Sequence, residues 1–419
     1  MELGWIDYSE EARQRTLAVL AALQESTAID ELGIGIVRDA FADFFFPATS
    51  TLFTRAKYLF LVPYALRDME REDNSAKTAA QLRKAYDDRE RNLAIELIKA
   101  NANDSTGIIG ARSLRSDFTG HWVKRGPAII YWAALRALGF CRKPDLGFDE
   151  CFRLMAGRGV STRRRATAEE VENGWNDDDA VFSSLWHVPD LSYADWHESR
   201  SILLTPDEAG FLSTQLGLKY PTSLYALLMR DSQALDVARQ ALGLVGDDQQ
   251  LRNAEEAFPR FAAAMRPLVD ETTATALTDA VAFSDFVYLC RVRYNAQLPT
   301  MAEAAEAEWQ EQVVPQAAAY ARALNVDRIY ATRQIGGHVG AGPLYRFLKE
   351  AREAALHGDV PTLDECIRRR ERSIKHGRAK IGKTEDLPDT WRGGRRLTYR
   401  FDVAASFALE VAQAGGAHA

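Results

Sequence analysis

The densest group of chemically active side chains in this sequence is a run of cations toward its C-terminal end. Between Arg368 and Arg400, twelve Lys or Arg residues stand against four Asp or Glu, a local net charge of +8 in a chain of net charge −7. Cations at this density neutralise phosphates and release counterions, which gives salt-dependent, sequence-tolerant binding of nucleic acid. Trp391 and Tyr399 in the same run carry rings on which bases can stack. The candidate nucleic-acid contacts are Arg368, Arg369, Arg372, Lys375, Arg378, Lys380, Arg392, Arg395 and Arg396. The alternative is a solvated helix face whose cations pair with the acidic remainder of the chain.

Three other motifs suit chemistry, and each has a plainer structural interpretation. The glycine-rich segment 336–342 precedes an expected helix, whose N-terminus attracts anions, but it lacks the sequence of known phosphate-binding loops, and a turn explains it equally. His187 and His197 each follow a Trp and lie near acidic residues, which suits metal binding or acid–base catalysis. Their spacing matches no known metal motif, so an aromatic-rich loop is favoured. The segment 376–380 lacks the Lys and Asp of the phospholipase D-type H-x-K-x-x-x-x-D signature. No catalytic residue, metal site or cofactor is therefore predicted.

Helical patterns dominate the chain and determine where these residues lie. Capping boxes at Thr205 and Thr362 each predict a helix start. A helix beginning at Thr362 places Arg368, Arg372 and Lys375 at i, i+4 and i+7, on one face. The expected helices cover residues 9–24, 30–46, 51–71, 76–100, 128–138, from 206 onward, 221–230, 233–244, 251–265, 272–294, 301–323, 343–356 and from 362 onward. Residues 101–126 and 157–193 are expected to be irregular, and 395–403 to form a strand or the start of a helix.

Length and composition indicate a globular protein with a sizeable core. The chain has 419 residues, 47% hydrophobic and 26% charged, and at about 150 residues per domain this predicts two or three domains. The expected fold class is mainly α, with packed multi-helix domains and a few short strands. The predicted divisions are an N-terminal helical domain at 1–150, an irregular Trp- and Asp-rich insertion or border at 151–204, a helical domain at 205–360, and a basic C-terminal helix and tail at 361–419.

The cysteine spacing and the lengths of the apolar runs indicate the cellular compartment of the protein. The four cysteines have no C-x-x-C spacing, which fits a reducing compartment. The N-terminus has no signal-peptide pattern, and the longest apolar run is nine residues, where a membrane helix needs about 20. We therefore expect a cytoplasmic protein with no membrane partner.

Five charged residues lie among apolar helical positions near the N-terminus: Arg38, Asp39, Asp43, Arg55 and Lys57. Because burying an unpaired charge is costly, we expect ion pairs that join the two helices of this region. The expected pairs connect Arg55 to Asp39 or Asp43.

The amino-acid sequence around these charged residues contains distinctive segments. The distinctive segments are 4–9, 30–35, 38–43, 46–47, 49–51, 54–63, 107–110 and 127–132, together with the Tyr399-Arg400 pair after the basic run. In these segments the chain resembles an uncharacterised family of bacterial proteins found in anti-phage defence islands. Such genes neighbour a helicase fused to a phospholipase D-type nuclease, as in Azaca-type systems. The resemblance implies an accessory role in a multi-protein defence complex and carries over no catalytic residue.

Three functions are compatible with the sequence. The leading hypothesis is a non-enzymatic subunit of a bacterial anti-phage defence system that binds DNA or a nuclease–helicase partner protein. The alternative is a nuclease or other hydrolase with an unrecognised site. A third is an interaction scaffold without DNA contact. A continuous basic groove would favour the first, and a cleft with converging His and carboxylate groups the second.

Overall fold

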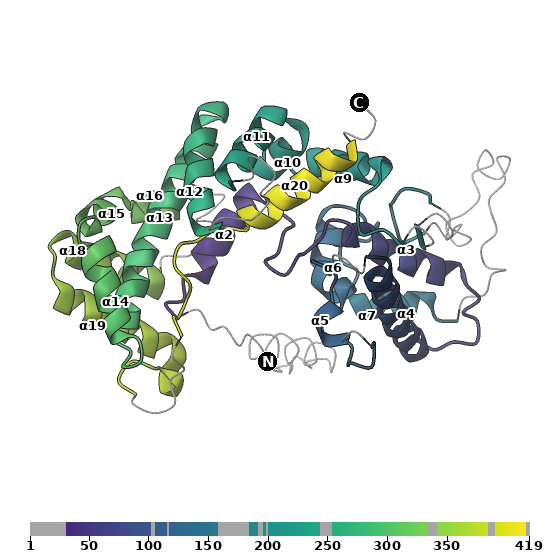
Figure 1. Ribbon diagram of the computed structural model, residues 1–419, viewed down its shortest axis with the longest axis horizontal. Helices are drawn as coiled ribbons and strands as arrows, with labels where there is room; N and C mark the ends of the chain where they lie inside the picture. The colour runs from purple at the N-terminus through teal and green to yellow at the C-terminus, as the bar shows by residue number, and fades with distance from the viewer. Residues whose placement is uncertain are drawn as a thin grey trace, which may run out of the picture. The chain divides into compact units, whose positions relative to one another are not determined.

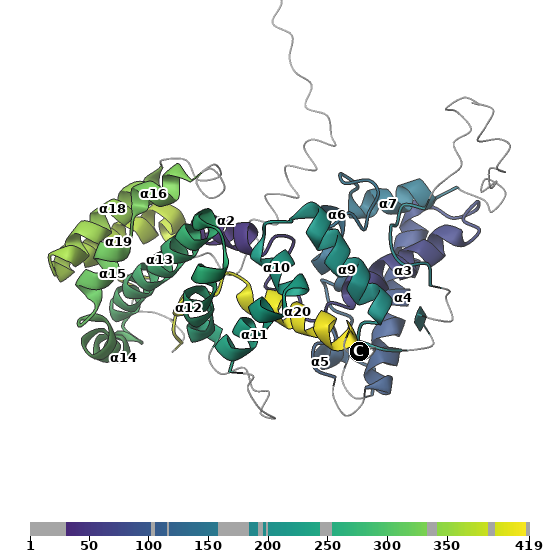
Figure 2. The same ribbon diagram turned by 90° about the horizontal axis from the view of Figure 1, so that it is seen from above.

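The protein is built of helices in the computed structural model (Figures 1 and 2). The structure describes residues 31–101, 105–114, 117–157, 184–191, 196–197, 200–243, 254–332, 342–383 and 390–415. Apart from one isolated antiparallel bridge between Cys141 and Trp186, these residues contain no strand, so the predicted mainly α fold is confirmed. None of the helices in these ranges has both the length and the apolar character needed to cross a membrane.

The helices form two compact units, and each unit combines two separate stretches of the chain. Unit 1 consists of residues 1–41 and 270–397, and unit 2 of residues 42–269 and 398–419. The consecutive domains predicted at 1–150, 151–204, 205–360 and 361–419 differ from this division. Composition reports only local character, whereas these units depend on packing between segments that are distant in sequence.

Unit 1 is arranged around one long helix, α13 (Glu271–Ala296), against which α14, α15 and α19 pack. Next to it, α18 and α19 lie side by side as a helical hairpin in both views (Figures 1 and 2). The other elements are the first part of α2 (Gly35–Phe45), α14 (Ala302–Glu308), the π-helical turn η5 (Trp309–Val313), α15 (Ala317–Ala323), α16 (Val326–Ala331), α18 (Pro343–Leu356), α19 (Val360–Lys375) and the 3-10 turn η6 (His376–Arg378).

Unit 2 contains the rest of α2 and most of the N-terminal motifs. Its C-terminal helix α20 packs along α9, α10 and α11 (Figure 2), so the last stretch of the chain lies against its middle. The helices are α3 (Tyr58–Arg71), α4 (Ala79–Ala100), α5 (Ala111–Leu114), α6 (Pro127–Ala137), α7 (Phe148–Met155), α9 (Pro206–Lys219), α10 (Leu224–Arg230), α11 (Ser232–Ala241), α12 (Ala254–Met265), the 3-10 turn η4 (Arg266–Leu268) and α20 (Phe401–Gly415).

The two predicted capping boxes have different outcomes. At Thr205 the box is confirmed, because the Thr205 hydroxyl accepts the Glu208 N–H at 3.3 Å and the Thr205 N–H donates to Glu208 Oε2 at 2.8 Å. At Thr362 it is wrong. Asp359 caps α19 instead, and its carboxylate accepts both the N–H and the hydroxyl of Thr362, at 3.0 and 2.7 Å. The helix that carries the basic residues is nonetheless present.

Other helix predictions differ at their ends. The helix expected from residue 51 begins only at Tyr58, because Thr54 and Arg55 donate their N–H groups to Tyr131 Oη, at 2.8 and 3.2 Å, rather than to helical carbonyls. Of the strand or helix start expected at 395–403, the helix start is confirmed, because α20 begins at Phe401. The helix expected at 9–24 and most of the irregular stretch 157–193 lie outside the described residues.

Candidate nucleic-acid interface

The basic face predicted on α19 is divided between buried and exposed positions. The buried residues Leu363 and Ile367 begin a stripe at i+4 spacing that continues through Glu371 and Lys375. Lys375 is 3% exposed and pairs with Glu31 and, at 3.6 Å, with Glu371. Lys375 is therefore not available to a nucleic acid, contrary to the prediction, because its ammonium group compensates two buried carboxylates.

Glu371 fixes the turn that follows α19. Its fully buried carboxylate accepts the Tyr294 hydroxyl at 2.7 Å and the N–H groups of Lys380 and Ile381 at 2.9 and 3.0 Å. Lys380 Nζ lies 3.3 Å from Glu31, and burial, together with nearby Arg392, lowers the pKa of Lys380. Lys380 therefore also holds the fold together, although it was predicted as a nucleic-acid contact.

Four further predicted contacts pair with acids of unit 1. Arg368 pairs with Glu365 at 2.5 Å, Arg369 with Glu350, Arg395 with Glu308, and Arg396 with Asp285 at 2.9 Å. Two of these guanidinium groups also lie over aromatic rings, Arg395 over Trp391 at 4.8 Å and Arg396 over Tyr288 at 4.4 Å. For these positions the alternative interpretation, cations paired with the acidic remainder of the chain, describes the structure.

Three predicted contacts remain without an acid partner in the described part of the chain. Arg372 and Arg378 are exposed, Arg392 is half-buried, and none of their side chains forms an ion pair with a described residue. Arg372 lies in the last turn of α19 and Arg378 in η6. Exposed Lys383 follows η6 in the chain, and its ammonium group donates to the Gly377 carbonyl of that turn at 2.8 Å. These residues form what we call the α19 tip: Arg372, Arg378, Lys383 and Arg392.

The two histidines that suggested catalysis lie in ordinary packing contacts. The ring of His187 meets Phe211 edge to face at 5.0 Å, and His197 Nε2 lies 3.1 Å from Glu96 Oε2. No group of three metal-ligating side chains occurs within the described ranges. Of the glycine-rich segment 336–342, only Gly342 is described, and it precedes the first residue of α18.

Three of the segments that carry the family resemblance, 54–63, 107–110 and 127–132, meet in unit 2. Tyr131 Oη accepts the N–H of Thr54 and donates to the Arg55 carbonyl at 3.0 Å, while the Thr54 hydroxyl donates to the Gly107 carbonyl at 2.7 Å. Gly107 has φ +81°, and a Cβ there would come within 2.7 Å of the Arg55 side chain, so this close approach requires glycine. We call this cluster, Thr54, Arg55, Gly107, Tyr131 and Glu410, the motif junction.

The ion pairs of this region differ from those predicted. Arg55 Nε pairs with Glu410 of α20 at 2.9 Å, and the other Glu410 oxygen accepts the Ala56 N–H at 3.0 Å. Asp39 pairs with its neighbour Arg38. The predicted pairing of Arg55 with Asp39 or Asp43 is wrong, because the actual partner comes from α20, and its packing against the N-terminal motifs was not predicted.

The other pairs also involve distant segments. Asp43 pairs with Arg400 at 2.6 Å, and Arg400 also donates to the Thr49 carbonyl, so the Tyr399-Arg400 pair joins the N-terminal motifs. Lys57 makes the most buried pair of unit 2. Its Nζ donates to both Glu208 oxygens, at 2.9 and 2.7 Å, and the two side chains are 1% and 0% exposed.

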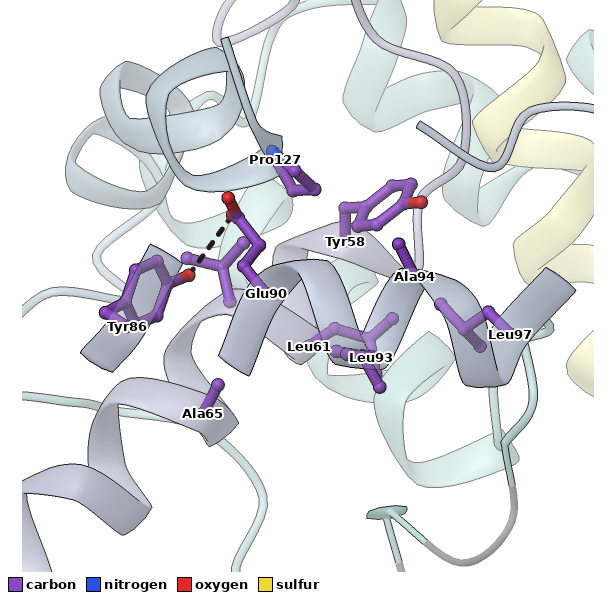
Figure 3. Close-up of a pocket in the computed structure, with 10 residues that line it drawn as sticks. Tyr58, Leu61, Ala65, Tyr86, Glu90, Leu93, Ala94, Leu97 and Pro127 are labelled. Atoms are coloured by element: carbon purple, nitrogen blue, oxygen red, sulfur yellow. Dashed lines mark hydrogen bonds between the residues drawn. The ribbon is translucent and has the colours of Figure 1, made fainter. Parts of the chain in front are cut away.

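A small internal cavity of about 10 Å³ lies between α3, α4 and the start of α6 (Figure 3). Its polar group is Glu90, whose carboxylate accepts the Ala128 N–H at 2.7 Å and the Tyr86 hydroxyl at 3.4 Å. Burial raises the pKa of Glu90 to about 7. A Cβ at Gly126 would lie 1.9 Å from Glu90 Oε2, so glycine makes room for the carboxylate. Glu90 thus caps α6, a role that local sequence reasoning missed.

Comparison with known proteins gives a similarity to one family over the N-terminal part of the chain and indicates no activity. A model of a family of unknown function, DUF6361, matches residues 1–153, less than half of the chain. The matched part contains the N-terminal motifs up to Tyr131 and excludes Glu208, α19 and α20. No curated protein and no solved structure matches the chain.

Proposed function

We propose that the chain binds DNA through the α19 tip and acts as a non-enzymatic component of a bacterial anti-phage defence assembly. The observation that supports DNA binding is the separation of the basic run into two groups. Six of its twelve cations pair with acids of unit 1, whereas Arg372, Arg378 and Arg392 have no acid partner in the described residues. The defence role and the helicase–nuclease partner rest on the family resemblance alone.

The positions of these cations suit binding of a phosphate backbone. The positive charge of Arg392 contributes to the lowered pKa of Lys380, and a polyanion relieves repulsion of this kind. The turn that carries Arg378 is fixed to α19 by the Glu371 carboxylate, so little ordering entropy is lost when a strand binds. Arg372 also has a structural role, because a cation in the last turn of a helix interacts favourably with the helix dipole.

The test is fluorescence anisotropy with two duplexes of unrelated sequence over a range of salt concentrations. In the double variant Arg372→Glu/Arg378→Glu we expect affinity to fall about tenfold or more on both duplexes, and the salt slope to fall by roughly one unit per lost phosphate contact. Lys375 must be left intact, since it is buried. The matched control is Arg112→Glu/Arg322→Glu, an equal charge change at exposed arginines that do not belong to the α19 tip.

Two results would contradict the proposal. If the α19-tip variant binds as the natural chain does, this surface is not the interface. If the natural chain binds no nucleic acid, DNA binding is excluded and the free cations become a docking surface for an acidic protein.

The hydrolase alternative is tested separately. Purified protein incubated with plasmid, single-stranded DNA and ATP, in the presence of Mg²⁺ or Mn²⁺, is expected to show no turnover. Turnover that is lost in His187→Ala or His197→Ala would replace the proposed function with an enzymatic one.

A further inference from the structure

A cleft of about 330 Å³ lies where α18 begins and α19 ends. Helix α18 contributes Pro343, Arg346 and Phe347 to its wall, and α19 contributes Arg369, Arg370 and Ser373. The two helices lie side by side in both ribbon views (Figures 1 and 2). The volume falls in the range of small-ligand sites, and the ring of Phe347 adds an apolar surface.

The lining of this cleft is strongly cationic. It contains three guanidinium groups and one carboxylate, Glu350, which pairs with Arg369. Arg370 is oriented by the carbonyls of Leu32 and Gly33, to which it donates at 2.9 and 3.3 Å. Arg346 is exposed and forms no ion pair with a described residue. The arginines that line this cleft thus come from two helices.

Backbone groups add to this positive potential. Pro343 is the first residue of α18, a helix of 14 residues, so the N-terminal end of its dipole lies at the cleft. The first N–H groups of a helix have no acceptor within the helix, which favours an anion. In α18 these groups belong to Leu344 and Tyr345, because Pro343 has no N–H and Arg346 donates its N–H to the Gly342 carbonyl at 3.3 Å. Arginine matches the tetrahedral oxygens of phosphate with paired N–H donors.

We propose that this cleft binds one phosphate group, supplied either by a nucleic-acid strand or by a free nucleotide. The site uses Arg346, Arg369 and Arg370, none of which belongs to the α19 tip. An experiment can therefore contradict phosphate binding at this cleft without contradicting DNA binding at the α19 tip, and the reverse.

The first experiment measures binding of radiolabelled inorganic pyrophosphate by equilibrium dialysis. The natural chain is expected to bind it saturably, with one molecule per chain. Arg346→Glu should weaken binding at least tenfold, while Arg346→Lys, which keeps the charge, should retain part of it. Arg322→Glu is the matched control, because Arg322 is exposed on α15, outside the cleft, and makes no ion pair with a described residue. Unfolding midpoints of the variants verify that each one folds.

Competition identifies the source of the phosphate. If a strand supplies it, unlabelled oligonucleotide displaces pyrophosphate and Arg346→Glu also weakens DNA binding. If a nucleotide supplies it, AMP or ATP displaces pyrophosphate and oligonucleotide does not. The absence of saturable pyrophosphate binding overturns the proposal, as does an equal loss in Arg346→Glu and Arg322→Glu. Retained pyrophosphate binding in Arg372→Glu/Arg378→Glu, with DNA binding lost, separates this site from the α19 tip.

Discussion

In unit 2, Arg55 and Lys57 are largely removed from water and each meets one carboxylate, whereas at the α19 tip of unit 1 Arg372 and Arg378 remain in water without an acid beside them. The side chains have the same chemistry in both places. Buried pairs of this kind fix the arrangement of the segments that they join, because removing one partner leaves an uncompensated charge. Arg372 and Arg378, which are exposed and pair with no acid in the described residues, are the cations left available to a ligand.

Lys375 and Lys380 show that charge density alone does not decide between these two roles. Both belong to the basic run, yet both pair with Glu31. What distinguishes Lys375 from Arg372 is its position on the helix, four residues after Glu371 on the buried stripe. Position relative to the core therefore separates structural cations from candidate binding cations.

The largest expected effect concerns the buried Lys57–Glu208 pair. Lys57→Met leaves the Glu208 carboxylate buried without its cation, and we expect the free energy of unfolding to fall by about 3–5 kcal/mol. Urea denaturation at neutral pH measures this loss. The control is Lys57→Met/Glu208→Leu, in which no charge remains buried and most of the stability should return. A loss below about 1 kcal/mol in the single variant would contradict the structural role of this pair.

Glu90 provides a test through pH. Its pKa of about 7 in the folded protein lies above that of an unfolded glutamate, so the folded state binds the proton more tightly. The resulting stability is fully present below the unfolded pKa and is lost as pH rises through about 7. Between pH 5 and pH 8, we expect the free energy of unfolding to fall by up to about 3 kcal/mol more in the natural chain than in Glu90→Gln. Parallel pH profiles in the two proteins would show that Glu90 does not titrate in this range.

A smaller effect is expected at the motif junction, where the ion pair is partly solvated. Arg55 and Glu410 are 19% and 15% exposed at their side chains, and burial raises the pKa of Glu410. A double-mutant cycle with Arg55→Gln and Glu410→Gln should give a coupling energy of about 1–2 kcal/mol. The measurement is denaturation of the four proteins under identical conditions. Additive losses would mean that the pair contributes nothing beyond its separate hydrogen bonds.

Local patterns predicted much of the helical content and little of the candidate site. The cap at Thr205 and helix α18 follow from signals within a few residues, so the sequence was sufficient to predict them. The pairing of Arg55 with Glu410 could not be predicted from local patterns, because it depends on α20 packing against residues more than three hundred positions earlier in the chain. The burial of Lys375 could have been predicted, because the i+4 spacing from Leu363 through Glu371 indicates a buried stripe that continues to Lys375. The charged residues at the same helical spacing point equally to an exposed basic face, so charge and apolar periodicity favour opposite positions for Lys375.

The smallest expected effect on stability is at the α19 tip, where exposed cations can be compared directly with the buried cations of unit 2. Arg372→Gln/Arg378→Gln should lower the free energy of unfolding by less than about 1 kcal/mol, since exposed cations contribute little and only Arg372 interacts with the helix dipole. Denaturation of this variant beside Lys57→Met compares the two classes of cation under the same conditions. A loss above about 2 kcal/mol would show that these arginines support the fold as the buried pairs do. If the free energy of unfolding is almost unchanged and DNA binding is weakened, these cations serve binding and contribute almost nothing to the stability of the fold. Their surface positions would then be explained by a ligand and not by packing.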